Sequence, residues 1–416
     1  MANLGKKRMT RRDFLKTSGK TAGVIGSALA FPEVLKSKAR AAGDTIKVGV
    51  LFSLSGPYGA GGSERAEGVK FAIEQINAKG GLLGKKVEAI VRDEQAHNPG
   101  VAATRAKELV EKEEVKFLIG GTSSATAPAM RDQTVPHKVL LFICCMADSI
   151  ITTPGFDRTV FHPYPSTAMF AKVNGRYAAK TFGTKWYFFI ADYAWGWDNF
   201  KTYKAVLDEF KGTNLGVSAH PLGASDYSPY ITKIMAAKPE VLIVINGGRD
   251  QINSWKSLRE FGAFEKMKIF GGALYYQSVL ASGVDAFWGG YGGTPFYWEE
   301  ELETTRTFVE AFTKKYNNPP IDNNQEGYTG MMELASGIQR AGTLDPDKII
   351  AAMEGHQFQW TKGPEYWRKC DHQSIQDMYV ITPKKPKKKY DIFQIVDKMG
   401  GEKIAQTCEE LGHKKN

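Results

Sequence analysis

The sequence predicts an α/β protein with two doubly wound lobes, each a parallel sheet with helices on both faces. Short apolar runs rich in β-branched residues alternate with stretches of helical periodicity. This alternation runs through the first 160 residues and then starts again, and repeated strand–helix units form parallel sheets. A chain of 416 residues is long enough for two lobes with separate cores.

The first strand–helix series begins after residue 45. Apolar runs predict strands at residues 46–53, 86–94, 115–119 and 139–145. Helices are predicted at residues 63–77 and 99–112, with a short helix after the third strand. In the first helix, Val69, Ile73 and Ile76 recur at helical spacing, and Asn98-Pro99 is a typical start for the second.

The second series begins after Pro163 and Pro165. Helices are predicted at residues 167–182, 197–211, 228–237 and 249–261. Strands are predicted at residues 185–192, 216–222, 241–246 and 267–272, and three more helices are expected after Trp298. Ligands of open α/β sheets bind beyond the carboxyl ends of the strands, so we expect the functional residues in the loops there.

Residues 1–41 are typical of an export signal. Arg11 and Arg12 precede Phe-Leu-Lys, a mild apolar run covers residues 21–31, and Ala39-Arg40-Ala41 offers a small-x-small cleavage site. The apolar run is too short to span a bilayer. We therefore expect a twin-arginine signal peptide, cleavage after Ala41, and a soluble mature protein in the periplasm.

The formal net charge of +10 comes mainly from this signal, which holds ten Lys/Arg and two acidic residues. The rest of the chain has 45 basic and 43 acidic residues. Such a balance argues against a basic stripe for nucleic acid, so no nucleic-acid partner is expected. Five lysines lie within residues 384–389, and we interpret that run as a solvated loop.

The four cysteines show no C-x-x-C spacing, so no zinc site is predicted, and no other metal or cofactor is expected. In an oxidising compartment, Cys370 and Cys408 are the plausible disulfide pair. Cys144 and Cys145 lie in an apolar run, where small buried residues are the expected interpretation.

A hydroxyl-rich step, Thr122 to Thr126, follows Gly120-Gly121 at the end of a predicted strand. Ser123 or Ser124 could cap the next helix. Ser123 could instead be the nucleophile of a secreted hydrolase, although the last glycine of G-x-S-x-G is missing and His372 is the best available base. Alternatively, serine hydroxyls and N–H groups at a helix start could hold a carboxylate.

Five segments, in order, carry a resemblance: "IKVGVLFSLSGPYG", "GVKFAIEQINAKGGLLGKKVEAIVRDEQ", "FLIGGTSSATAPA", "SDYSPYITKIMAAKPEVLIV" and "KCDHQSIQDMYV". Over nearly its full mature length the chain resembles the leucine-binding-like periplasmic proteins of branched-chain amino acid and amide ABC transporters. The resemblance implies a type I periplasmic binding fold whose lobes close on a ligand by a three-strand hinge. Lobe 1 is expected at residues 42–163 and 294–376, and lobe 2 at 164–293 and 377–416, including the tail.

The resemblance also implies a ligand-binding set. Ser123, with its neighbour Ser124, matches the carboxylate-binding serine, and Tyr58 matches the tyrosine of the first loop. Cys145, Met146 and Ala147 match the stretch after the fourth strand, where Ala147 replaces the hydroxyl residue of the family. Trp195 matches the aromatic residue of the second lobe, and Tyr275 is expected nearby. Arg249 is a candidate second anion contact.

The acid that holds a ligand's ammonium group in the family is missing after "IFGG", where Ala273, Leu274 and Tyr275 follow. A buried ammonium group needs such a partner. We therefore expect a monomeric solute-binding protein, not an enzyme, for an amino acid-like or aromatic or apolar carboxylate. The membrane permease and ATPase subunits of an ABC importer are its expected partners.

Overall fold

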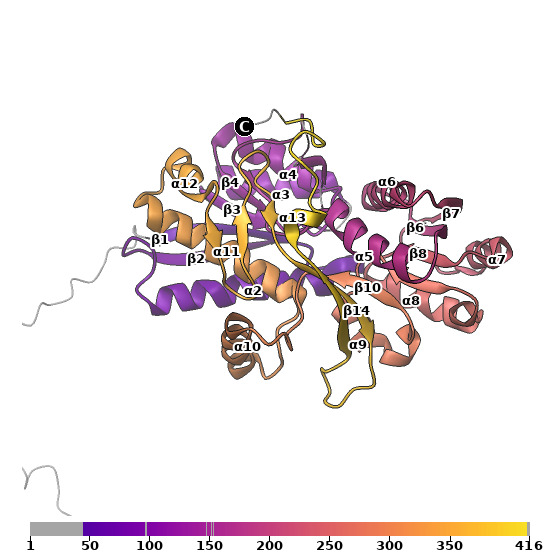
Figure 1. The fold of residues 1–416 in the computed structure, drawn as a ribbon. Coiled ribbons are helices and arrows are strands. Elements are labelled where there is room, and N and C mark those ends of the chain that lie inside the picture. The colour runs from indigo at the N-terminus through magenta and orange to yellow at the C-terminus, as the bar shows by residue number, and fades with distance from the viewer. Residues whose placement is uncertain (1–44, 96–97, 147, 151, 153, 414–416) are drawn as a thin grey trace, which may run out of the picture. The chain divides into compact units, whose positions relative to one another are not determined.

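The computed structural model describes residues 45–95, 98–146, 148–150, 152 and 154–413 (Figure 1). The predicted export signal and Ala147 lie outside these residues. Asp44–Asn416 form one compact unit, which contains two large sheets. None of its described helices is long and apolar enough to cross a membrane.

The first sheet is parallel throughout, as predicted, with the strand order β2-β1-β3-β4-β5. Its strands are β1 (Thr45–Phe52), β2 (Lys86–Asp93), β3 (Phe117–Gly120), β4 (Leu140–Ile143) and β5 (Val160–Phe161). The helices between its strands are α2 (Gly59–Ala78), α3 (Pro99–Glu111) and α4 (Ala127–Thr134). Three later helices are α10 (Glu303–Tyr316), α11 (Asp322–Ala341) and α12 (Pro346–Met353).

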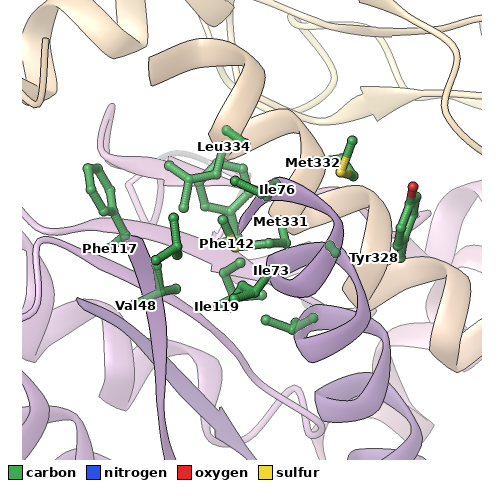
Figure 2. Packing of buried hydrophobic residues seen from close by; sticks show 14 of the residues in the cluster. Val48, Ile73, Ile76, Phe117, Ile119, Phe142, Tyr328, Met331, Met332 and Leu334 are labelled. Atoms are coloured by element: carbon green, nitrogen blue, oxygen red, sulfur yellow. The ribbon is translucent and has the colours of Figure 1, made fainter. Parts of the chain in front are cut away.

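The core of this first half lies between the sheet and the helices α2 and α11 (Figure 2). Ile73 and Ile76 of α2 and Met331 and Leu334 of α11 belong to one buried cluster with Val48 of β1. Helix α2 is the next α-helix after β1, which it follows after a short loop that includes the 3-10 turn Gly56–Tyr58. This packing fixes the first turn of α2 beside the loops in which a ligand is expected.

The second sheet has seven strands in the order β15-β14-β10-β9-β8-β6-β7. They are β6 (Lys185–Ala191), β7 (Thr213–His220), β8 (Val241–Ile245), β9 (Lys268–Gly271), β10 (Tyr291–Thr294), β14 (Met378–Pro383) and β15 (Phe393–Met399). Its helices are α5 (Thr167–Thr181), α6 (Ala194–Glu209), α7 (Ser228–Ala237), α8 (Gly248–Glu260) and α9 (Tyr276–Ser282). The strands β14 and β15 are antiparallel additions to an otherwise parallel sheet.

The predicted parallel pairing is confirmed from β7 to β10, and the antiparallel strand β14 at this edge was not predicted from the sequence. Strand β14 runs in the opposite direction to β10, and the segment 384–392 returns the chain as β15. A small third sheet joins β11 (Gln357–Phe358), β12 (Glu365–Trp367) and β13 (Ser374–Ile375), and the short helix α13 (Gly401–Ile404) lies near the C-terminus. The limits of the two lobes stay a prediction.

The segments that link the two sheets are bonded to one another. The Gln373 side-chain amide donates to the Tyr164 carbonyl (2.8 Å), and that of Gln376 donates to the Pro163 carbonyl (2.7 Å). The buried Lys362 ammonium donates to the Pro295 carbonyl (2.8 Å). Segments distant in the sequence thereby lie together where the chain passes from one sheet to the other.

Cys370 and Cys408 form a disulfide in the structure, the pair that the sequence predicts, with Cα atoms 6.1 Å apart and a sequence separation of 38. The bond ties the C-terminal segment to the turn before β13. Replacing both cysteines by serine should lower the free energy of unfolding by roughly 2–4 kcal/mol, since the unfolded chain regains the entropy of an open loop. Denaturant unfolding of the oxidised wild type and the double variant measures this loss, and equal midpoints would contradict it.

Candidate functional site

A small cavity lies between loops of the first sheet and loops of the second. Five of the predicted site residues line it: Tyr58, Ser124, Cys145, Trp195 and Tyr275. The other lining residues are Gly61, Arg65, Thr122, Met146, Tyr164, Tyr193, Gly248 and Gln277. Residues from positions 58 to 277 thus meet at the carboxyl ends of the parallel strands, where ligands of such sheets bind.

Three predicted residues are not in this wall. Ser123 is buried directly behind it, between the lining residues Thr122 and Ser124. Arg249 is in the first turn of α8, where its neighbour Gly248 lines the cavity instead. Ala147 lies outside the described residues.

The hydroxyl-rich step forms a turn rather than the start of a helix. Helix α4 begins only at Ala127, and Thr126, at its N-cap, donates from its hydroxyl to the Ser123 carbonyl (2.9 Å). The expectation that Ser123 or Ser124 caps this helix was therefore wrong. The Ser124 hydroxyl donates to the Met146 carbonyl (2.5 Å), which joins the turn to the segment after β4.

The buried carboxylate of Glu94 fixes this turn from behind. It accepts hydrogen bonds from the Thr122 N–H (2.7 Å), the Ser53 hydroxyl (3.0 Å) and the Thr126 hydroxyl (3.2 Å). Burial raises the pKa of Glu94 to about 7, and these hydrogen bonds oppose the increase. Glu94 directly follows β2, so a single side chain sets the position of the loop after β3.

Aromatic rings form much of the cavity wall. The hydroxyl groups of Tyr58, before α2, and Tyr193, after β6, lie 3.0 Å apart, so the two sides of the cavity are in direct contact. Trp195 is 4% exposed, and its indole N–H points at the Met146 sulfur (3.4 Å). Burial raises the pKa of Tyr275 and of Tyr164 above the ordinary tyrosine value, so both stay neutral. Such a wall suits a flat apolar group.

Arg65, in the first turns of α2, is the only charged residue among the described residues that line the cavity. Its side chain is 7% exposed, and its Nε donates to the Glu326 carboxylate of α11 (2.7 Å). Burial by itself would lower the pKa of Arg65, but Glu326 raises it, so the guanidinium stays charged. A Cβ atom built at Gly61 would lie 3.2 Å from Arg65 Nη1, 3.2 Å from Asn323 Nδ2 and 3.5 Å from Gln277 Nε2. Three side-chain nitrogens therefore converge at a position that the glycine keeps open.

Sequence reasoning did not single out Arg65, Tyr164, Tyr193 or Gln277. A signal for Arg65 existed, because it lies four residues before Val69 on the apolar stripe of α2. A charged residue on a buried stripe needs a partner and often marks a site. For Gln277 and Tyr193 we find no comparable signal in the sequence.

The described histidines nearest to the hydrolase alternative do not favour it. Both ring nitrogens of His372, the best candidate, face other groups, the Val160 carbonyl (3.1 Å) and Glu354 (3.2 Å). The His162 ring lies against Gln373 and the Cys145 carbonyl. Among the residues described, no cluster of His, Cys, Asp and Glu could hold a metal ion. An aromatic-walled cavity between two α/β halves defines a solute-binding protein.

The chain belongs to the periplasmic binding protein family, whose model matches residues 45–389. It is similar to a leucine-, isoleucine-, valine-, threonine- and alanine-binding protein of Pseudomonas aeruginosa, with 23% identity over 323 residues, 77% of this chain and 85% of the relative. A periplasmic binding protein structure from Burkholderia mallei is 28% identical, with a TM-score of 0.82 and coverage of 88% and 98% of the two chains.

A second similar structure shows an ABC transporter solute-binding protein of Rhodopseudomonas palustris BisB5 in complex with 3,4-dihydroxybenzoic acid. It shares the fold with a TM-score of 0.76 at 23% identity, and the match covers 86% of this chain and 98% of that one. All three of these relatives are binding proteins.

Proposed function

We propose that this protein is the periplasmic solute-binding component of an ABC importer and that its solute is an aromatic or otherwise apolar carboxylate. The observation that carries the choice of solute is the composition of the cavity wall. Five aromatic side chains and one buried guanidinium line it, and none of the described lining residues is Asp or Glu. An α-ammonium group would meet Arg65 there and no lining carboxylate, which disfavours a free amino acid.

In this proposal Arg65 supplies the charge for the carboxylate, and the turn at Thr122–Ser124 supplies hydrogen-bond donors. Tyr58, Trp195 and Tyr275 cover the apolar part of the solute. Of the relatives, the structure in complex with 3,4-dihydroxybenzoic acid supports this class of solute, whereas the Pseudomonas aeruginosa relative is a binding protein for leucine, isoleucine, valine, threonine and alanine. The protein does no chemistry, acts as a monomer, binds no nucleic acid, and delivers the solute to a permease with its ATPase.

A ligand panel tests this proposal. Benzoates, phenylpropenoates and aliphatic carboxylates should be compared with leucine, valine, phenylalanine and small amides by thermal melting of the exported, processed protein. A ligand at a hundred times its dissociation constant stabilises the folded state by about 2.7 kcal/mol, a measurable shift. Carboxylates without an amino group are expected to raise the melting temperature. A shift with free amino acids alone would reject the proposed solute class.

Ser123→Ala tests the contribution of the turn. We expect binding of the best carboxylate to weaken roughly ten- to a hundredfold, because a donor to a charged group contributes about 1.5–3 kcal/mol. Isothermal titration calorimetry measures the loss. Ser336→Ala, a serine on the far part of α11, is the control and should bind as the wild type does. Unchanged affinity in Ser123→Ala would leave this serine with only a role in the turn.

A further inference from the structure

Glu326 is buried and is bonded to Arg65, the one charged residue among the described residues that line the cavity. The carboxylate is 1% exposed, and its Oε2 accepts from Arg65 Nε at 2.7 Å. The other oxygen, Oε1, is buried without a hydrogen-bond partner among the described residues. A carboxyl group with one unpartnered oxygen costs more free energy to bury when it is ionised than when it is protonated.

A solute carboxylate would share Arg65 with Glu326. One guanidinium would then face two carboxylates in a place that water does not reach, and two like charges at one site cannot both ionise without a large cost. A proton on Glu326 removes the repulsion and keeps the neutral acid beside the guanidinium. The entry of an anion therefore favours the protonated form of Glu326.

Several other ionisable groups face Glu326. Arg65 comes from α2, Asp322 from the first turn of α11, Tyr164 from the segment before α5, and Tyr275 from the segment after β9. Cys144 and Cys145 follow β4.

Burial raises the pKa of Glu326 to about 8 against the opposing effect of Arg65, and it raises that of Asp322 to about 6. Burial raises the pKa of both tyrosines and both thiols, which therefore stay neutral at this pH. Glu326 is thus the acid nearest to Arg65 and the one that titrates above neutral pH.

We infer that Glu326 is a proton-binding residue of the solute site, so that a carboxylate solute and a proton bind together. This inference rests on the proposed function, because it needs an anionic solute at Arg65. The direction of the pH dependence of binding follows from the competition of Glu326 and the solute carboxylate for Arg65. Below about pH 7 Glu326 already carries its proton and the affinity is constant. As the pH rises through about 8, the proton must be taken up on binding, and the affinity falls by up to tenfold per pH unit.

Proton uptake is measured directly on the wild type. Calorimetric titration with benzoate, or with the strongest carboxylate of the panel, is run at pH 8 in two buffers of different ionisation enthalpy. The difference between the observed enthalpies gives the protons taken up, and we expect about half a proton per solute. No uptake at pH 8, together with a constant affinity from pH 6 to 9, would overturn the inference.

Glu326→Gln keeps the shape of the side chain and replaces the carboxyl group by an amide that does not titrate. In this variant the affinity should be independent of pH from 6 to 9, and at pH 9 the variant should bind about tenfold more tightly than the wild type. Glu333→Gln is the matched control, since Glu333 is a buried acid two turns along α11, bonded to Trp360 and Trp367 away from the cavity. It should keep the wild-type profile.

The variants also separate the possible failures. A wild-type pH profile retained in Glu326→Gln would assign the proton to another group and overturn the inference, and Asp322→Asn would show whether that group is Asp322. Should Glu326→Gln not fold, the proton count on the wild type still decides. If no carboxylate binds at any pH, the proposed function itself fails. If one binds without proton uptake, only the present inference fails.

Discussion

Replacing Arg65 by methionine should weaken binding of a carboxylate solute by at least a hundredfold. The guanidinium lies in the cavity wall, and its Nε is engaged by Glu326, which leaves its Nη groups for the solute. Charge-assisted hydrogen bonds contribute about 1.5–3 kcal/mol each, so two of them correspond to a factor of roughly 10² to 10⁴ in affinity. Methionine keeps an apolar stem of similar length and removes the charge.

The loss of Arg65 also leaves Glu326 without its partner, and this effect must be separated from binding. The double variant Arg65→Met/Glu326→Gln removes both members of the buried pair and should fold, because an apolar or neutral replacement of a buried pair costs little. It should still fail to bind. Arg340→Met, on the exposed end of α11, is the control for loss of one positive charge. A folded double variant with wild-type affinity would show that Arg65 does not hold the solute.

Most of the fold could be predicted from the sequence, because local periodicity decides it. The alternation of apolar runs and helical stripes places β1, β6 and β8 within two residues of the observed limits. Helix α7 is predicted at its observed residues, and α5 to within one. The antiparallel edge was missed for a physical reason. A strand does not reveal from its own residues which way it runs, and the direction of β14 is set by the point where the chain enters the second sheet.

The candidate site was predicted less completely, since it is formed by contacts between distant residues. Tyr58 and Trp195 follow from the resemblance of their loops to those of a family. Arg65 and Glu326 are separated by 261 residues, and only the packing of α2 against α11 brings them together. The hydroxyls of Ser123 and Ser124 looked available in the sequence, yet the structure uses the latter to hold the Met146 carbonyl. The type of a residue therefore shows which hydrogen bonds its side chain can make. Its partners in the folded protein decide whether that side chain is free to bind a solute.

Two glycines at the start of α8, Gly247 and Gly248, lie close to the opposite side of the cavity. Gly248 has a φ of +55°, and a Cβ atom there would lie 2.4 Å from the Pro57 carbonyl oxygen of the opposite side. A Cβ atom at Gly247 would lie 2.9 Å from the Tyr58 ring. Both of these close contacts are with the segment Pro57–Tyr58. The Tyr58 hydroxyl also lies 3.0 Å from the Tyr193 hydroxyl on the other side of the cavity. The two sides can approach this closely because positions 247 and 248 have no side chains.

Gly248→Ala should therefore weaken solute binding by at least a hundredfold while the protein stays folded. The methyl group meets a backbone oxygen, which cannot move as a flexible side chain can, so the two sides must separate. The apparent dissociation constant rises in proportion as the closed, binding-competent population falls. Calorimetry gives the affinity, and small-angle X-ray scattering with and without solute shows whether the variant still contracts.

Gly283→Ala is the matched control for backbone strain. Gly283 also has a positive φ, +84°, but a Cβ atom there meets nothing within 4 Å. Both variants carry the cost of an alanine in a conformation that favours glycine, about 1 kcal/mol or more of stability. Only Gly248→Ala adds the contact with Pro57, so only it should lose affinity. Equal affinity in the two variants would mean that the solute binds without the close approach of Gly248 to Pro57, and that this contact is not required for binding.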